Sequence, residues 1–159
     1  VTQGFLPVAG YNYGAKNYVR VNETISKSIK WAAGLATVIF ILILVLAEPI
    51  VAIFSKDATI IKETPSALRL VFAASPIIAI QLIGAAYFQA AGKAIPALLL
   101  TLTKQGFFLI PLILVLPNYY GIFGVWIAFP IADILSTLVT GFFLKREMNR
   151  KLTLAQDGI

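Results

Sequence analysis

Three polar side chains, Asp133, Lys104 and Gln81, lie inside otherwise apolar stretches, where they can do chemistry. A charged side chain near the centre of a membrane helix costs about 2.5–3.5 kcal/mol to insert, so we expect these residues to face a bundle interior or a water-filled cavity. Asp133 can bind a coupling proton or cation, or hold a cationic substrate. Alternatively, it is a buried carboxylate that pairs with Lys104 or with a hydroxyl group and fixes the packing of two helices.

Hydroxyl side chains follow Asp133 at helical spacing. Ser136, Thr137 and Thr140 lie three, four and seven residues beyond it, so in a helix all four share one face. Such a polar stripe is poorly suited to lipid. We therefore expect this face to lie against other helices or a cavity.

Lys104 and Gln105 form a second polar pair. In a helix, Lys104 shares a face with Phe108 and Pro111, so an ammonium group, an aromatic ring and a kink would line one groove. Because Lys104 lies two or three turns from the predicted helix end, it can also extend toward water along its aliphatic stem. Both readings stay open.

Small residues and amides predict close helix contacts. Gly10 and Gly14 stand four apart beside Asn12, so both glycines lie on one helix face that a second helix can approach closely. Gly84 lies near Gln81 and is predicted to serve packing, while Gln81 is a candidate to line a cavity. Asn12 is a further candidate for the pathway.

The composition places the chain in a lipid bilayer. It is 59% hydrophobic and 13% charged, with a mean hydropathy of +0.88, which is outside the range of a soluble domain. The sequence has no cysteine and no histidine, which excludes disulfides, thiolate metal sites and imidazole catalysis. No paired carboxylates or serine–base pair converge at one depth, so we do not expect an enzyme. The basic residues form no extended patch, which argues against nucleic acid.

Four apolar runs are long enough to cross the hydrocarbon core as helices, at about residues 31–54, 68–91, 96–116 and 122–144. Residues 1–30 are expected to hold the end of a preceding transmembrane helix and an amphipathic cytoplasmic connection, and residues 145–159 a cytoplasmic tail. The fold class is therefore an all-α, polytopic transmembrane helical bundle. Because Val1 is not an initiator and residues 5–9 look like the last turns of a helix, we expect a piece of the C-terminal part of a longer membrane protein.

Loop charges predict the orientation. Most basic residues fall on one side of the four-span meander, namely Lys16, Arg20, Lys27, Lys30, Lys93, Lys145, Arg146, Arg150 and Lys151. The other side has only Lys56 and Lys62, with Arg69 at a helix start. By the positive-inside rule, the N-terminal connection, the turn at Lys93 and the C-terminal tail are cytoplasmic. The expected location is the plasma (inner) membrane.

Four segments carry a family resemblance. Residues 4–15, 87–93, 104–111 and 124–133 read GFLPVAGYNYGA, YFQAAGK, KQGFFLIP and GVWIAFPIAD. In this order and spacing they resemble the multidrug and toxic compound extrusion (MATE) family, over essentially the whole chain.

The resemblance implies a C-terminal third of a twelve-helix antiporter with two six-helix lobes, from the end of helix 8 through helix 12. Such transporters expel cationic or amphipathic drugs in exchange for protons or sodium, with no cofactor. The implied partners are these drugs, the lipid bilayer and the N-terminal helices. Some family members place an ion-binding carboxylate on helix 10, whereas the corresponding span here carries Gln81 and neither Asp nor Glu. The coupling ion and any metal site stay unassigned.

We therefore expect a cation-coupled multidrug efflux antiporter that works by alternating access, with Asp133, Gln81, Lys104, Gln105 and Asn12 along the substrate or ion pathway. Two alternatives remain. A lipid-linked oligosaccharide flippase of the same superfamily would be favoured by abundant cations along a lumen. A non-transporting four-helix membrane scaffold predicts that the polar stripes of Gln81, Lys104 and Asp133 face one another, fully paired, with no cavity.

Overall fold

The computed structural model describes residues 1–156, and the elements of this part of the chain are all helices. They follow in the order α1 (Thr2–Gly14), α2 (Tyr18–Phe54), α3 (Ala58–Val71), α4 (Ser75–Ala90), α5 (Ala94–Leu102), the π-helix η1 (Thr103–Leu109), α6 (Ile110–Val115), α7 (Pro117–Tyr120) and α8 (Ile122–Gln156).

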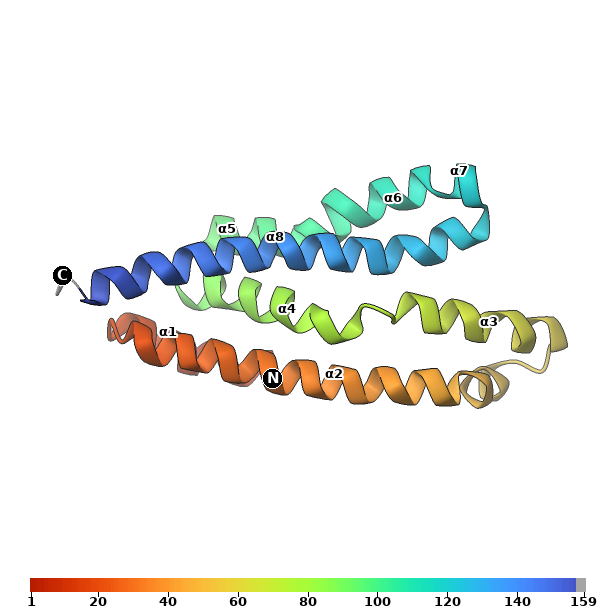
Figure 1. The fold of residues 1–159 in the computed structure, drawn as a ribbon, viewed down its shortest axis with the longest axis horizontal. Coiled ribbons are helices and arrows are strands. Elements are labelled where there is room, and N and C mark those ends of the chain that lie inside the picture. Colours follow the sequence, from red (N-terminus) through yellow and green to blue (C-terminus); the bar gives the residue numbers. More distant parts are fainter. Residues whose placement is uncertain (157–159) are drawn as a thin grey trace.

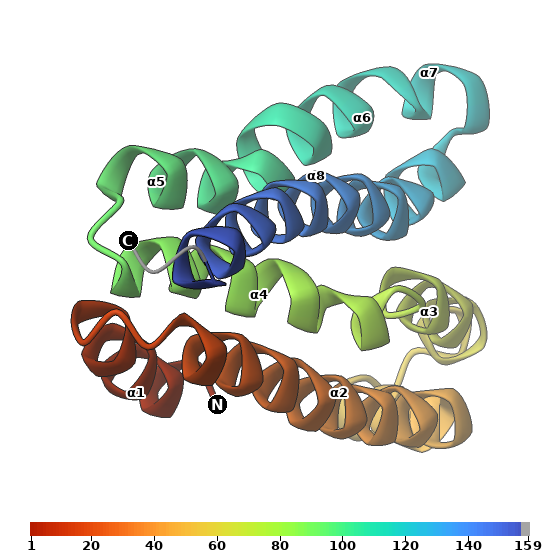
Figure 2. The same cartoon turned by 60° about the vertical axis from the view of Figure 1, so that its left-hand side comes forward.

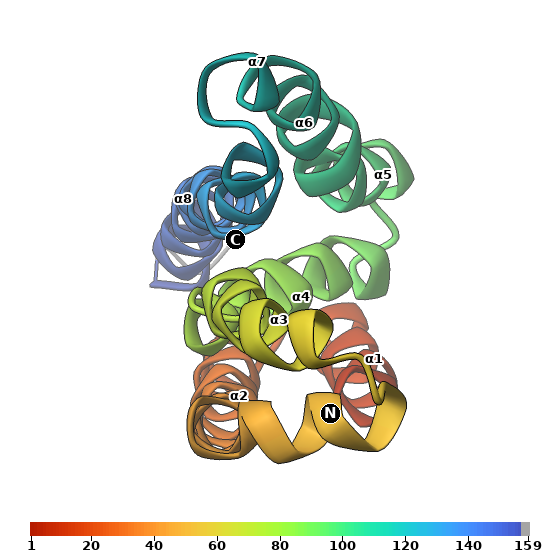
Figure 3. The same cartoon turned by 90° about the vertical axis from the view of Figure 1, so that its right-hand side faces the viewer.

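The helices form three layers. α3 and α4 lie in the middle, with α1 and α2 on one side and α5, α6 and α8 on the other (Figures 2 and 3). α4 contacts α1, α2, α5 and α8. It is therefore the central helix of the bundle.

The protein core surrounds the second half of α4. Ile83 and Tyr87 of α4 are buried, and they belong to one cluster with Phe5 of α1, Val21 of α2 and Leu144 of α8. Elsewhere large apolar side chains point outward, and Trp31 at 78% exposure is an extreme case. An apolar outer surface of this extent suits contact with lipid.

Within residues 1–156, three helical runs are long and apolar enough to cross a membrane: residues 18–54, 94–120 and 122–153. α3 and α4 pass the same test only together, and they are bent by 46° at the break between them. If this bent pair is one span, the structure has the four spans that the sequence predicts.

Two helices extend beyond the boundaries expected from the sequence. α2 begins at Tyr18, where the side chain of Asn17 accepts a hydrogen bond from the backbone N–H of Arg20 (3.2 Å) and caps the helix, so the expected connection before residue 31 is continuous with the span. α8 continues to Gln156 and does not end at Leu144, so most of the expected tail is helical. The lysine, arginine, glutamate and methionine residues after Leu144 are good helix formers. The last part of that tail, residues 157–159, lies outside the described residues.

Prolines explain the irregular backbone of the middle spans. Pro76 has no N–H to donate to the carbonyl of Phe72, and Ser75 N–H donates to that carbonyl at 3.0 Å, closing a tighter turn where α3 and α4 separate. Pro111 likewise cannot bond to the carbonyl four residues before it. The preceding turns widen into η1, in which Ile110 N–H donates to the carbonyl of Gln105.

The segments that carry most of the basic residues meet at one end of the bundle. The α1–α2 turn, the α4–α5 connection and the end of α8 lie together there, whereas the α2–α3 loop and α7 lie at the opposite end (Figure 1). This arrangement agrees with the one-sided charge distribution on which the predicted orientation depends.

Candidate functional site

The structure brings two of the predicted polar residues into contact. Lys104 of η1 and Asp133 of α8 form an ion pair, with Lys104 Nζ 2.6 Å from Asp133 Oδ1. The Asp133 side chain is 3% exposed and the Lys104 side chain 25%. Oδ1 accepts no hydrogen bond of good geometry from the described residues, so it is charge attraction that holds this pair. The buried carboxylate therefore depends on the Lys104 ammonium for its neutralisation.

The hydroxyl stripe beyond Asp133 is buried. Ser136 Oγ donates to the backbone carbonyl of Asp133 at 3.1 Å, and Thr137 Oγ1 donates to the carbonyl of Ile77 at 3.5 Å. Thr140 Oγ1 has no hydrogen-bond partner among the described residues. The stripe thus lies between helices, as the spacing predicts, and Thr137 links α8 to α4.

Gly84 allows this close approach of α4 and α8. A Cβ atom added at Gly84 would overlap the methyl carbon of Thr140. Only a residue without a side chain fits at this position in the present packing.

A cavity of about 340 Å³ lies beside the ion pair, between α1, α4 and the α5–η1 segment. Gln81, Lys104 and Gln105 contribute to its lining, together with Gln89 and Thr101. Lys104 therefore borders the cavity and also contacts Asp133. Asp133 is not among the residues that line the cavity, so the cavity lies on the Gln81 side of Lys104.

The N-terminal candidates lie elsewhere. Asn12 of α1 donates from Nδ2 to the carbonyl of Val8 within its own helix (2.8 Å) and does not line the cavity. A Cβ at Gly10 would lie 3.4 Å from the carbonyl oxygen of Ala90, so α1 packs closely on the end of α4 here. Gly14 differs, because an added Cβ would meet nothing within 4 Å. It makes no close helix contact within the described part of the chain.

The π-helix η1 separates two cavities. Lys104 and Gln105 line the cavity described above, whereas Thr103, Phe107 and Phe108 line a larger one of about 830 Å³ toward α8. π-turns inside helices are frequent at functional sites. Here the turn presents its residues to both cavities.

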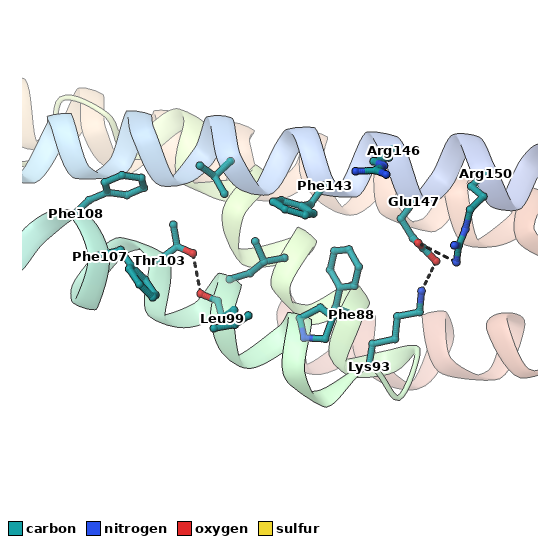
Figure 4. A pocket seen from close by; sticks show the side chains of 13 residues that line it. Phe88, Lys93, Leu99, Thr103, Phe107, Phe108, Phe143, Arg146, Glu147 and Arg150 are labelled. Carbon is teal, nitrogen blue, oxygen red and sulfur yellow. Dashed lines mark hydrogen bonds and ion pairs between the residues drawn. The ribbon is translucent and has the colours of Figure 1, made fainter.

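The larger cavity is not among the sites expected from the sequence. Figure 4 shows that Phe143, Arg146, Glu147 and Arg150 of α8 line it. From residue 145 onward the sequence predicts a tail, in which the two arginines are charges that set the orientation. Arg146, Glu147 and Arg150 follow Phe143 by three, four and seven residues, and this spacing predicts a shared helix face.

Among the described residues, no group of three or more His, Cys, Asp or Glu side chains could hold a metal ion.

Comparisons with known proteins give consistent results. The family model described as MatE matches residues 1–115. The multidrug export protein MepA of Staphylococcus haemolyticus is 26% identical over 150 residues, which cover 94% of this chain and 33% of MepA. The chain thus spans about one third of the length of this relative.

Solved structures share the fold. A chain described as protein A is 40% identical with a TM-score of 0.86, and the match covers 93% of the present chain and 33% of the other. The outward-facing conformation of a multidrug resistance MATE family transporter of the MOP superfamily is 20% identical with a TM-score of 0.90, over 96% of the present chain and 35% of that one.

Proposed function

The chain belongs to the MatE family, and on that premise we propose that it is part of a cation-coupled multidrug efflux antiporter and not of an enzyme. It is a multi-pass membrane protein, as its apolar helices and its family indicate. The proposed transporter exports cationic or amphipathic compounds by alternating access. It lies in the plasma (inner) membrane with the basic end of the bundle in the cytoplasm.

The observation that carries this proposal is the place of Lys104 between a buried carboxylate and a cavity. While Lys104 is paired, its charge is neutralised by Asp133. A proton or sodium ion that binds Asp133 neutralises the carboxylate, and the charge attraction that holds Lys104 there is lost. The ammonium then moves toward Gln81 and Gln105, which line the same cavity as Lys104.

A free ammonium in the cavity competes with a cationic compound. Two like charges about 4 Å apart repel by about 4 kcal/mol at an effective dielectric constant of about 20. This energy corresponds to a loss of affinity of about a thousandfold. Binding of the coupling ion at Asp133 therefore promotes release of the drug, and binding of the drug promotes release of the ion, as an exchanger requires.

The lining of the cavity beside Lys104 favours a small amphipathic compound over a lipid-linked sugar as its occupant. Lys104 is the one charged residue among those that line it in the described part of the chain, whereas an anionic lipid-linked sugar calls for several cations. Glutamine side chains and apolar groups suit small amphipathic compounds better.

The experiment is ethidium efflux from de-energised and then re-energised cells that express the full-length transporter. We expect Asp133→Asn to lower gradient-driven efflux by about tenfold or more at equal membrane abundance. The matched control is Glu48→Gln, which removes a carboxylate that is 70% exposed and pairs with Arg69 at 3.6 Å. This control is expected to keep wild-type efflux. Repeating the assay with a proton or a sodium gradient alone identifies the coupling ion.

Normal efflux by Asp133→Asn would overturn the proposal, because Asp133 would then be a packing residue and the coupling site would lie outside this chain. Lys104→Arg separates charge from geometry. If only the positive charge matters, this variant keeps efflux, although its forked donor group replaces a compact ammonium.

A further inference from the structure

The larger cavity forms a groove with an apolar wall. It has a volume of about 830 Å³ and lies between the end of α4, α5 with η1, and the second half of α8 (Figure 4). Phe88, Leu100, Phe107 and Phe143 line it from these three segments. The hydroxyl of Thr103, which also lines it, already donates to the carbonyl of Leu99 at 2.7 Å. This part of the groove therefore offers apolar contact.

The other end of the groove is charged. Glu147 pairs with Lys93, and its Oε2 lies 3.5 Å from the guanidinium of Arg150. Arg146 also lines the groove and makes no ion pair with any described residue. Three cations and one carboxylate thus line this end of the groove, with a local net charge of +2. Figure 4 shows these four side chains together at one end.

The groove lies where its two ends match the two parts of a bilayer. Its charged end is formed by the α4–α5 connection and the last turns of α8, at the basic end of the bundle (Figure 1). Its apolar wall extends from there toward the middle of the spans. An occupant with an anionic head at the membrane surface and an apolar chain pointing inward fits both parts.

We propose that this groove binds an anionic phospholipid from the leaflet at the basic end of the bundle. Arg146 and Arg150 hold the phosphate, and Lys93 and Glu147 set their positions through the ion pairs described above. One acyl chain lies against Phe107 and Phe143. The net positive charge disfavours cationic drugs in this groove. This inference does not depend on the efflux activity.

The test is a titration of the full-length transporter in detergent with phosphatidylglycerol, in which lipid-bound species are counted by native mass spectrometry. We expect Arg146→Gln to weaken the most tightly bound phosphatidylglycerol by about tenfold, because one charge-assisted contact to phosphate is lost. Lys145→Gln is the matched control, since Lys145 is the adjacent exposed cation and does not line the groove. It should leave this binding within about twofold.

A second variant and its matched control test the apolar wall of the groove. Phe107 is 60% exposed and lines the groove, whereas Phe54 is 87% exposed and does not. Phe107→Ala is expected to weaken binding of phosphatidylglycerol, and Phe54→Ala is expected to leave it unchanged.

Three results would overturn the proposal. Equal losses in Arg146→Gln and Lys145→Gln would mean that diffuse surface charge attracts the lipid. Equal affinity for phosphatidylcholine and phosphatidylglycerol would mean that the cations do not recognise the head group. Displacement of the lipid by an equal concentration of inorganic phosphate would mean that the site is a phosphate site without use of its apolar wall.

Discussion

Removal of Lys104 should destabilise the protein more than removal of Asp133. The two side chains form one ion pair, but the Asp133 side chain is 3% exposed while that of Lys104 is 25% exposed and borders a cavity. When Asp133 is replaced by asparagine, the ammonium can turn into the cavity and find water or amide groups there. When Lys104 is replaced by glutamine, the carboxylate stays between helices without a cation.

The expected loss of unfolding free energy in each variant follows from how deeply the remaining side chain is buried. Breaking a buried pair so that an uncompensated charge remains costs about 3–5 kcal/mol. We expect Lys104→Gln to approach the lower end of this range, about 3 kcal/mol, because the pair lies beside a cavity. Asp133→Asn should cost about 1 kcal/mol, close to the loss of one ordinary polar contact. The double variant should be less destabilised than Lys104→Gln, since no isolated charge is left.

The assay is thermal unfolding of the purified full-length transporter, read as a double-mutant cycle of Asp133→Asn and Lys104→Gln. The control cycle uses Glu48 and Arg69, an ion pair at 3.6 Å with side chains 70% and 36% exposed. That cycle should show a coupling below about 1 kcal/mol, as exposed ion pairs do. If Asp133→Asn destabilises the protein as much as Lys104→Gln, the ammonium has no access to the cavity and the proposed exchange mechanism fails.

Two further predictions concern glycines, and the same unfolding assay tests both. Gly84→Ala should destabilise the protein by about 1–3 kcal/mol, because the new Cβ overlaps the Thr140 methyl carbon. Adding Thr140→Ser removes this methyl group and should restore most of the lost stability. Gly14→Ala is the control, because a Cβ added at Gly14 meets no atom within 4 Å. A loss at Gly84 that Thr140→Ser does not relieve would contradict this contact. Gly121→Ala should cost about 1–3 kcal/mol, because Gly121 has φ +57° and ψ −141° at the α7–α8 turn. Gly34→Ala in α2, which also has open space, should instead be neutral or stabilising, and equal effects at the two sites would refute the strain argument.

The sequence by itself determined the class of the protein and the course of its spans. Long apolar runs can be stable in a bilayer only as helices that satisfy their own backbone hydrogen bonds, so composition and run length are enough to predict an all-α membrane bundle. The stripe that begins at Asp133 was readable for the same reason, because helical spacing alone decides which residues share a face. Loop charges likewise predicted which segments share one end of the bundle.

The ends and bends of the helices were less predictable, because they depend on local hydrogen bonds that the sequence indicates only weakly. One side-chain cap at Asn17 starts α2 early. A proline in the sequence indicates an irregular helix, yet whether it bends the helix, as Pro76 does, or induces a π-turn, as Pro111 does, depends on the donors that neighbouring residues supply.

Only the tertiary structure decided which polar groups meet. From the sequence, Lys104 can line a groove or extend toward water, and Asp133 can pair with Lys104 or with a hydroxyl group. Which of these contacts forms depends on how η1 rotates against α8. Gly14 and Gly84 look alike in the sequence, but only Gly84 faces a neighbouring helix closely enough to exclude a side chain. Contacts between helices depend on their rotation and separation, which the pattern within one helix does not contain. The cavity beside Lys104 and the groove beside Arg146 arise in this way, from surfaces of different helices that come together on folding.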